Sequence, residues 1–237
     1  MSETPKAIYL FADSQLLFWK QDGPGFLDSI RSEIGKENPK AAYVGASNND
    51  QVEFYQLFEA AMEGLGIRNC RMIRASFSAA EAAFVNEADL ILLSGGDVET
   101  GWNAFQQNAL GEALVQRYYE GAVLIGVSAG AVQLGWGAAR RNSASTAGLL
   151  ETFKLVPYLI GVHEEKDEWK ELIQLVVEMK GALPGLGIPI GAGAIYRPGE
   201  SIEPVRHLLS EYHFSGDSLT HDLLVPVSNL MQPTEVW

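Results

Sequence analysis

The stretch Ala122-Val-Leu-Ile-Gly-Val-Ser-Ala-Gly-Ala-Val-Gln-Leu-Gly135 (AVLIGVSAGAVQLG) places one serine between glycines at the end of an apolar run. The run over 122–128 predicts a buried strand, and the small residues after it predict a helix that begins at once. Gly126-Val-Ser128-Ala-Gly130 satisfies the G-x-S-x-G pattern of a nucleophile elbow, which needs this strand-turn-helix context. From the pattern alone, Ser128 is either a nucleophile on a strained turn or a hydroxyl in a tightly packed connection.

Short apolar runs alternate with longer amphipathic segments through the first half of the chain. Their nearly continuous hydrophobicity is typical of strands that are buried on both faces of a parallel sheet. Between them, residues 49–66 carry apolar side chains at helical spacing. The pattern predicts an α/β fold with a doubly wound, mostly parallel sheet and helices on both faces. The expected strands are 7–12, 41–47, 70–75, 88–96 and 122–128.

The pattern is less regular after Leu150. Residues 170–183 predict a helix, and residues 191–209 predict a hairpin that turns at Pro198-Gly199. Residues 218–230 are expected to form a final strand or a loop. Because no repeat or linker interrupts the chain, residues 1–237 are predicted to form a single domain.

The composition excludes several classes of protein. A hydrophobic fraction of 47% and a charged fraction of 20% are ordinary for a globular protein. The net charge of −13 and the lack of a basic patch argue against nucleic acid or an anionic membrane as a partner. The single cysteine, Cys70, excludes an internal disulfide and a multi-cysteine metal site, and no cofactor is expected. With no signal sequence or membrane-length apolar run, the simplest expectation is a soluble, cytoplasmic protein.

Polar residues and glycines follow the expected strands, and ligands of such folds bind at the carboxyl ends of the strands. Gly96, in the segment Ser94-Gly95-Gly96-Asp97, offers an unencumbered backbone N–H. The N–H of Ala129, directly after Ser128, is a second donor of the kind that stabilises an oxyanion. The alternative is that Gly95-Gly96 only forms a turn.

A histidine is the usual general base for a serine nucleophile. His163 ends the strand-like segment LVPYLIGVH (155–163), which would bring its imidazole to the same cleft as Ser128. Taken alone, it could equally be a surface or core histidine. The other three histidines, His207, His213 and His221, are expected to be structural because they lie in the irregular C-terminal part.

Together these segments resemble the peptidase E and cyanophycinase group of serine peptidases, whose fold is related to that of class I glutamine amidotransferases. The elbow is the most specific match, and the other segments follow it in the family's order. The resemblance implies that Ser128 is the nucleophile, His163 its base, and the N–H groups of Gly96 and Ala129 the oxyanion hole. It also implies hydrolysis of a short peptide or a related amide through an acyl-enzyme. The matching segments are 41–66, 88–97, 123–135, 155–163 and 185–196.

The chain departs from the family pattern at two places. Pro189-Ile190 stands where the family usually carries Asp-Glu, so the carboxylate that would orient His163 is missing there. Glu151, Glu164 and Glu165 are the candidates to replace it. An acidic run, 164–168, follows the histidine where basic residues are usual, so recognition of an N-terminal aspartate is not expected.

These departures motivate an alternative function: a catalytically degraded family member that binds a small ligand or a protein partner. An α/β-hydrolase esterase shares the elbow but predicts an acid followed by a histidine late in the chain. A glutamine amidotransferase is disfavoured because its chemistry uses cysteine at the elbow. The sequence leaves a homodimer open.

Overall fold

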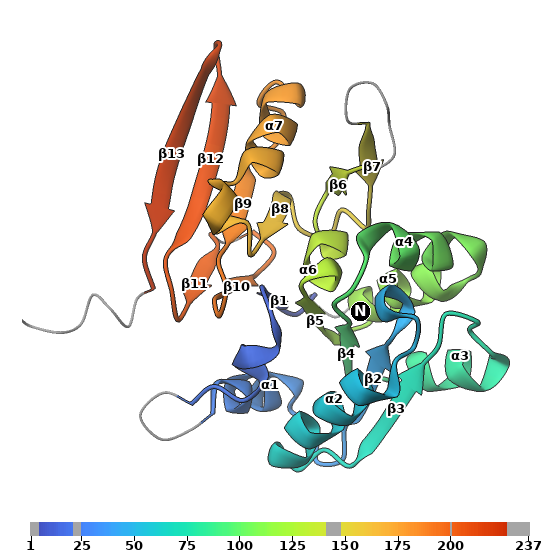
Figure 1. Ribbon diagram of the computed structural model, residues 1–237. Coiled ribbons are helices and arrows are strands. Elements are labelled where there is room, and N and C mark those ends of the chain that lie inside the picture. Colours follow the sequence, from blue (N-terminus) through green and yellow to red (C-terminus); the bar gives the residue numbers. More distant parts are fainter. Residues whose placement is uncertain (1–4, 21–24, 141–147, 200, 227–237) are drawn as a thin grey trace, which may run out of the picture.

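The structure is a computed structural model, and it describes residues 5–20, 25–140, 148–199 and 201–226. A seven-stranded sheet forms its centre, with the strand order β11-β10-β1-β5-β4-β2-β3 (Figure 1). Strands β1 to β5 are parallel, whereas β10 and β11 form an antiparallel hairpin on β1. The strands are β1 Ile8–Phe11, β2 Lys40–Val44, β3 Asn69–Ile73, β4 Leu90–Leu93, β5 Val123–Val127, β10 Gly193–Tyr196 and β11 Glu203–Val205.

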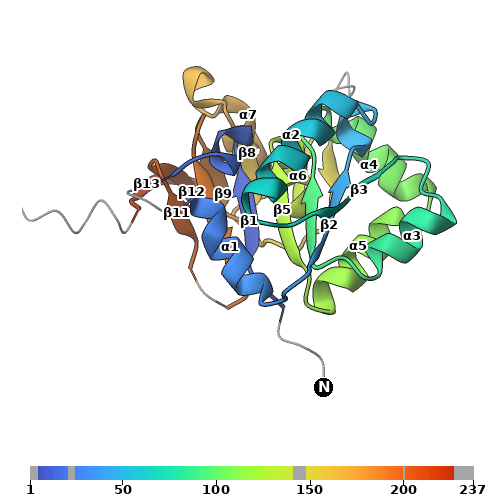
Figure 2. The same ribbon diagram turned by 90° about the horizontal axis from the view of Figure 1, so that it is seen from below.

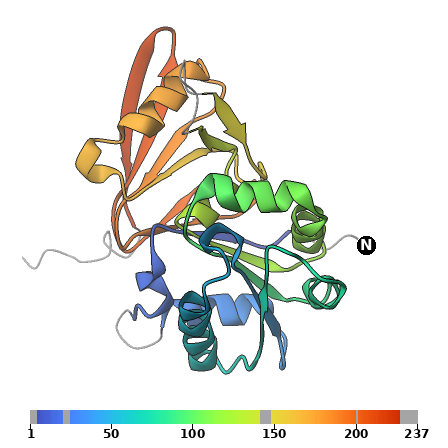
Figure 3. The same ribbon diagram turned by 45° about the vertical axis from the view of Figure 1, so that its right-hand side comes forward.

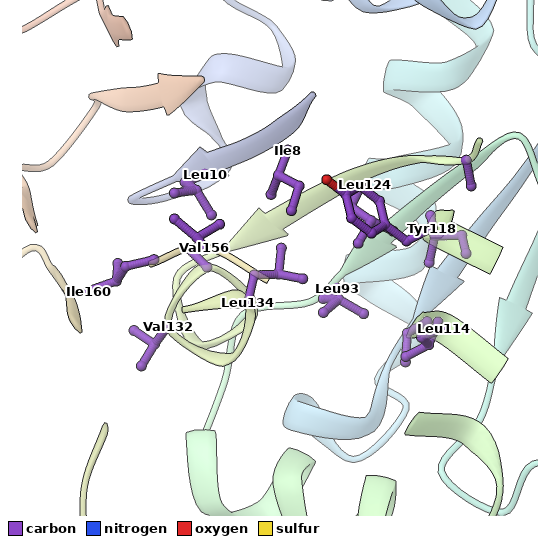
Figure 4. Packing of buried hydrophobic residues seen from close by; sticks show 14 of the residues in the cluster. Ile8, Leu10, Leu93, Leu114, Tyr118, Leu124, Val132, Leu134, Val156 and Ile160 are labelled. Atoms are coloured by element: carbon purple, nitrogen blue, oxygen red, sulfur yellow. The ribbon is translucent and has the colours of Figure 1, made fainter. Parts of the chain in front are cut away.

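Helices cover both faces of this sheet (Figure 2) because its side chains are apolar on both faces. In β1, Ile8 and Leu10 belong to one hydrophobic cluster, and Tyr9 and Phe11 belong to the other. Figure 4 shows the first cluster, in which α5 and α6 pack on β1, β4 and β5. Helices α1 Phe26–Ile34 and α2 Val52–Gly64 cover one face, and α3 Ala79–Val85, α4 Val98–Gln107, α5 Leu110–Tyr119 and α6 Ala129–Leu134 cover the other.

This arrangement confirms the predicted doubly wound α/β fold. The five expected strands are all present, and each is shorter than the apolar run that predicted it. The hairpin with its turn at Pro198-Gly199 is also confirmed, as β10 and β11. The helix expected over 49–66 begins only at Val52, and Asp50 instead accepts hydrogen bonds from the backbone of Ala75.

A second, four-stranded sheet lies beside the first (Figures 1 and 3), with the strand order β13-β12-β9-β8. Helix α7 packs on it through a separate apolar cluster that includes Trp169, Leu172 and Tyr212. The sequence predicted α7 and left residues 218–230 as a final strand or a loop, but it did not predict a sheet that joins these elements. The elements are β8 Leu159–Val162, α7 Lys170–Glu178, β9 Gly185–Ile188, β12 Leu209–Ser215 and β13 Ser218–Leu224.

The segment 185–196 links the two sheets. Its two strands, β9 and β10, do not pair with each other: β9 joins the second sheet and β10 joins the first. The turn between them contains Pro189, which has no backbone N–H to continue a ladder. The remaining elements are short: η1 Ser14–Leu17, η2 Ala46–Asn48, η3 Glu165–Asp167 and the two-stranded ribbon β6 Gly137–Ala139 with β7 Leu149–Glu151.

In the part of the chain that the structure describes, no helix combines the length and the apolar character that crossing a membrane would require.

Candidate active site

Ser128 lies on a strained turn between β5 and α6. Its φ of 49° and ψ of −111° are rare for a residue with a side chain, and such strain is concentrated at functional sites. The turn is held because the backbone N–H of Ser128 donates to the carbonyl of Phe11 at 2.8 Å, and its own carbonyl accepts from Ala131. Gly130 is needed beside it, since a Cβ there would lie 2.3 Å from the carbonyl oxygen of Leu93. The strand-turn-helix context of an elbow is therefore present.

His163 directly follows β8, in the second sheet. It also has a positive φ, 46°, and its backbone N–H donates to the carbonyl of Ile188. Its Nε2 lies 2.8 Å from the Oγ of Ser128, within the range over which a base takes a proton from a hydroxyl. The structure therefore brings together the two side chains that sequence reasoning selected 35 positions apart.

The glycine turn after β4 contacts the elbow. A Cβ at Gly95 would lie 3.4 Å from the Cβ of Ser128, so the two turns are in contact. Gly96 has a φ of 137°, and a Cβ there would lie only 2.0 Å from the carbonyl oxygen of Ser47, so only glycine fits. Gly96 and Ala129 line the same cavity as Ser128 and His163. The two residues predicted to supply oxyanion donors thus border the predicted nucleophile.

Two polar side chains outside the predicted catalytic set, Gln133 and Ser47, join these turns. Gln133 of α6 is fully buried, and its Nε2 donates to the Oγ of Ser47 at 3.0 Å and to the carbonyl of Val98 at 3.0 Å. These hydrogen bonds connect α6 to the start of α4 and to the loop after β2. Gln133 is the one glutamine in a segment of small and apolar residues. Because a buried amide needs hydrogen-bond partners, such a residue indicates a structural hydrogen bond to another segment.

The cavity has a volume of about 240 Å³. Its walls are apolar over much of their area, with aliphatic side chains from α6, β8 and α7. Carboxylates are the other main component, and none of the described residues that line the cavity is a lysine or an arginine. The acidic lining residues are Asp97, Glu99, Glu164 and Glu171.

The three carboxylates predicted as candidates to orient His163 occupy different places. Glu151 is exposed on β7 and forms an ion pair with Lys154 at 2.7 Å. Glu164 lines the cavity, and its Oε2 is buried without a hydrogen-bond partner. Glu165 accepts a hydrogen bond from the backbone N–H of Ile190 at 3.4 Å, and its Oε2 is likewise buried and without a partner. Among the described residues, none of these carboxylates hydrogen-bonds the ring of His163.

Carboxylates from elsewhere in the chain contact the turn that contains Pro189-Ile190. Besides the contact of Glu165 with Ile190, the Oδ2 of Asp13 accepts from the N–H of Gly191 at 2.7 Å. Two carboxylates therefore lie at this turn, although neither Pro189 nor Ile190 is acidic.

The remaining histidines do not line this cavity. His221 stacks on Tyr212 with ring centroids 4.6 Å apart, and the Nε2 of His213 lies 3.2 Å from a carboxylate oxygen of Glu211. Cys70 is partly buried, and burial raises the pKa of its thiol to about 11, so it is protonated at neutral pH.

Burial, together with repulsion by Glu171 and Asp167, raises the pKa of Glu164 to about 7, although a backbone N–H of Leu172 opposes the shift. The folded protein therefore binds the proton of this carboxyl more tightly than the unfolded chain does. As the pH rises from 4.5, the ordinary pKa of a glutamate, to about 7, the ionising carboxyl increasingly destabilises the fold. We expect Glu164→Gln to be about 1–2 kcal/mol more stable than the wild type at pH 8, after allowance for solvent screening, and about equal at pH 4.

Urea denaturation at pH 4, 6 and 8 measures this difference. Glu178→Gln, an exposed change on α7, is the control and should show no such trend. A stability difference for Glu164→Gln that stays constant with pH would contradict the shifted pKa.

The family comparison places the chain among the peptidases. A model of peptidase family S51 matches residues 20–204, and the chain therefore belongs to this family. A comparison with curated protein sequences finds no significant match.

Two solved structures are similar to this chain. A peptidase from an acI-B1 Actinobacterium has a TM-score of 0.69 and 18% identity, over 95% of this chain and 96% of that one. A putative peptidase E protein from Listeria monocytogenes EGD-e has a TM-score of 0.59 and 17% identity, over 86% of this chain and 100% of that one. At these identities the likeness concerns the fold.

Proposed function

We propose that this protein is a serine-type peptidase that hydrolyses a short peptide or a related amide through an acyl-enzyme on Ser128. The observation that carries the proposal is the 2.8 Å distance between the Oγ of Ser128 and the Nε2 of His163, on a strained turn at the cavity. The Oγ attacks the carbonyl carbon while His163 takes its proton, and His163 then gives that proton to the departing amine. Water activated by His163 then hydrolyses the ester and frees the serine.

The negative oxygen of the tetrahedral intermediate needs donors beside Ser128. We assign this role to the backbone N–H groups of Gly96 and Ala129, because both residues border the cavity next to the nucleophile. A backbone donor held by a rigid turn needs no reorganisation during the reaction. The contacts of Gln133 with Ser47 and Val98 support that rigidity.

For the group that orients His163, we favour Glu165. Its Oε2 is buried without a partner, which leaves an acceptor available, and its Oε1 contacts the turn where the family carries Asp-Glu. A change in its side-chain torsion would have to bring the free oxygen to the imidazole when substrate binds, as catalytic hydrogen bonds often tighten only in the complex. Glu151 is less suited because it is exposed and paired with Lys154.

The second candidate function is a degraded family member that binds a ligand without turnover. The observation in its favour is that no carboxylate among the described residues hydrogen-bonds the ring of His163. Both candidates predict a ligand in the cavity, and they differ only in whether Ser128 reacts.

A fluorophosphonate probe separates the two functions. We expect covalent labelling of the wild type at Ser128, seen by mass spectrometry of the intact protein and of its peptides, and none of Ser128→Ala. Ser94→Ala is a matched control, since Ser94 follows a neighbouring strand and does not line this cavity. Absence of Ser128-dependent labelling, together with no cleavage across a dipeptide panel, would leave the non-catalytic function.

A further inference from the structure

Strand β13 forms an open edge of the second sheet. It is the last strand in the order β13-β12-β9-β8, and within the described part of the chain it pairs only with β12, over all 7 of its residues. Figure 1 shows it at the outer margin of the molecule. Every residue of the strand is exposed except Leu224, which is partly buried. The backbone N–H and C=O groups on the outer side of such a strand can pair with an added strand.

One face of this edge is apolar although it meets solvent. Leu219 and Leu223 are 40% and 56% exposed, and they point to the same face because side chains alternate along a strand. His221 lies between them, and its ring stacks on Tyr212, which belongs to the apolar cluster beneath α7. Native proteins usually avoid apolar side chains on an unpaired edge strand. An added strand would cover these two leucines.

We infer that β13 pairs antiparallel with β13 of a second copy of this chain, so that the second sheets of the two copies become one continuous sheet. A two-fold axis at His221 places Leu219 of each copy opposite Leu223 of the other, and Asp222 opposite Thr220. An axis moved by one residue along the strand would place Asp222 opposite its own copy, or Leu219 opposite His221. The strand is therefore self-complementary in one register, as a two-fold interface requires.

The charge of the strand also permits this pairing. Asp222 is the one residue of β13 among the Asp, Glu, Lys and Arg types, and in the inferred register it faces a neutral threonine. Two copies can therefore approach each other at this edge without opposed carboxylates, although each chain carries a net charge of −13.

A strand pair of this length is a small interface. With one strand of 7 residues from each copy, it buries less than the roughly 800 Å² per partner that is typical of stable complexes. We therefore expect a reversible dimer with a Kd of about 1–100 µM.

Sedimentation velocity measures this association in a concentration series from about 1 to 300 µM, a range that brackets the expected Kd. Hydrogen exchange followed by mass spectrometry, at the two ends of the series, should show slower exchange in β13 at the higher concentration. A protein that stays monomeric throughout would overturn the inference. So would protection of β13 that does not change with concentration, because another segment of the same chain would then cover the edge.

Charge exchange tests the register. Leu219→Glu should raise the Kd about 10-fold or more, because a carboxylate then faces Leu223 of the other copy at both ends of the strand pair. Adding Leu223→Lys to the same chain should restore most of the affinity, since each introduced carboxylate then lies opposite an introduced ammonium. Leu219→Lys combined with Leu223→Lys should remain monomeric. The two positions lie about 13 Å apart along one strand, so no compensation arises within a single copy.

Leu57→Glu is the matched control, since Leu57 is 43% exposed on α2 of the first sheet. It should leave the Kd unchanged, and circular dichroism should show that all variants fold, because each substituted side chain is exposed. A dimer that survives Leu219→Glu, that is not restored by the added Leu223→Lys, or that is lost in Leu57→Glu would overturn the inference. None of these measurements depends on turnover, so they are independent of the proposed function.

Discussion

Replacing His163 with glutamine lowers kcat/KM about 10⁴- to 10⁶-fold on any peptide that the wild-type protein cleaves, as the loss of a base does in comparable dyads and triads. Glutamine can still hydrogen-bond the Oγ of Ser128, now 2.8 Å from the imidazole, but it cannot accept and return the proton. The expected loss is therefore in kcat, and fluorophosphonate labelling of Ser128 should slow in parallel. Steady-state kinetics and the labelling rate measure both effects.

His213→Gln is the matched control, since His213 lies on β12 of the same sheet and does not line the cavity. It should change the rate less than about twofold. Circular dichroism should show that both variants fold, because His163 is exposed and its substitution removes no buried packing. A loss smaller than about 10-fold for His163→Gln would rule out general-base catalysis by this residue.

Replacing Gly96 with alanine combines a folding defect with a catalytic one. The new Cβ would overlap the carbonyl oxygen of Ser47, at 2.0 Å, and the φ of 137° is strained for any residue with a side chain. The glycine turn must move away from the elbow to relieve this overlap. We expect a loss of about 2–4 kcal/mol in the free energy of unfolding and, in protein that remains folded, a fall of about 10²- to 10³-fold in kcat as the oxyanion donor is displaced.

Gly199→Ala tests whether the losses in Gly96→Ala come from the overlap with Ser47 or from backbone strain. Gly199 also has a positive φ, 85°, but a Cβ there would have no atom within 4 Å, and it lies in the turn of the β10–β11 hairpin. It should cost only about 1 kcal/mol and leave kcat unaltered. Urea denaturation gives the free energy of unfolding, and kcat is measured on the same preparations. A Gly96→Ala protein with the kcat of the wild type would exclude this turn as the source of an oxyanion donor.

The sequence predicted the central sheet well because its signals are local. A buried parallel strand is a continuous apolar run, and the elbow needs glycines within two residues of Ser128, so both can be recognised without knowing the partner elements. His163 could be selected for a similar reason, because it directly follows a short apolar run, β8.

What could not be predicted depends on contacts between distant segments. The second sheet joins β8 and β9 to β12 and β13, and no local pattern in the sequence shows which of these distant strands pair. The segment 185–196 contains two strand signals, yet nothing in its pattern shows that they separate into different sheets at Pro189. The three candidate glutamates are equivalent in sequence, and only burial and the contacts of Glu165 and Glu164 distinguish them.

Because β9 and β10 separate at Pro189, Ser128 and His163, the pair proposed to react, follow strands of two different sheets. Ser128 and its glycine turns belong to the first sheet, whereas His163 and the wall formed by Glu164 and Glu171 belong to the second. The first sheet carries the strained turn on which Ser128, the proposed nucleophile, lies. The second sheet carries the proposed base, His163, together with the acidic residues of the wall, so a change in the wall need not alter the turn on which Ser128 lies.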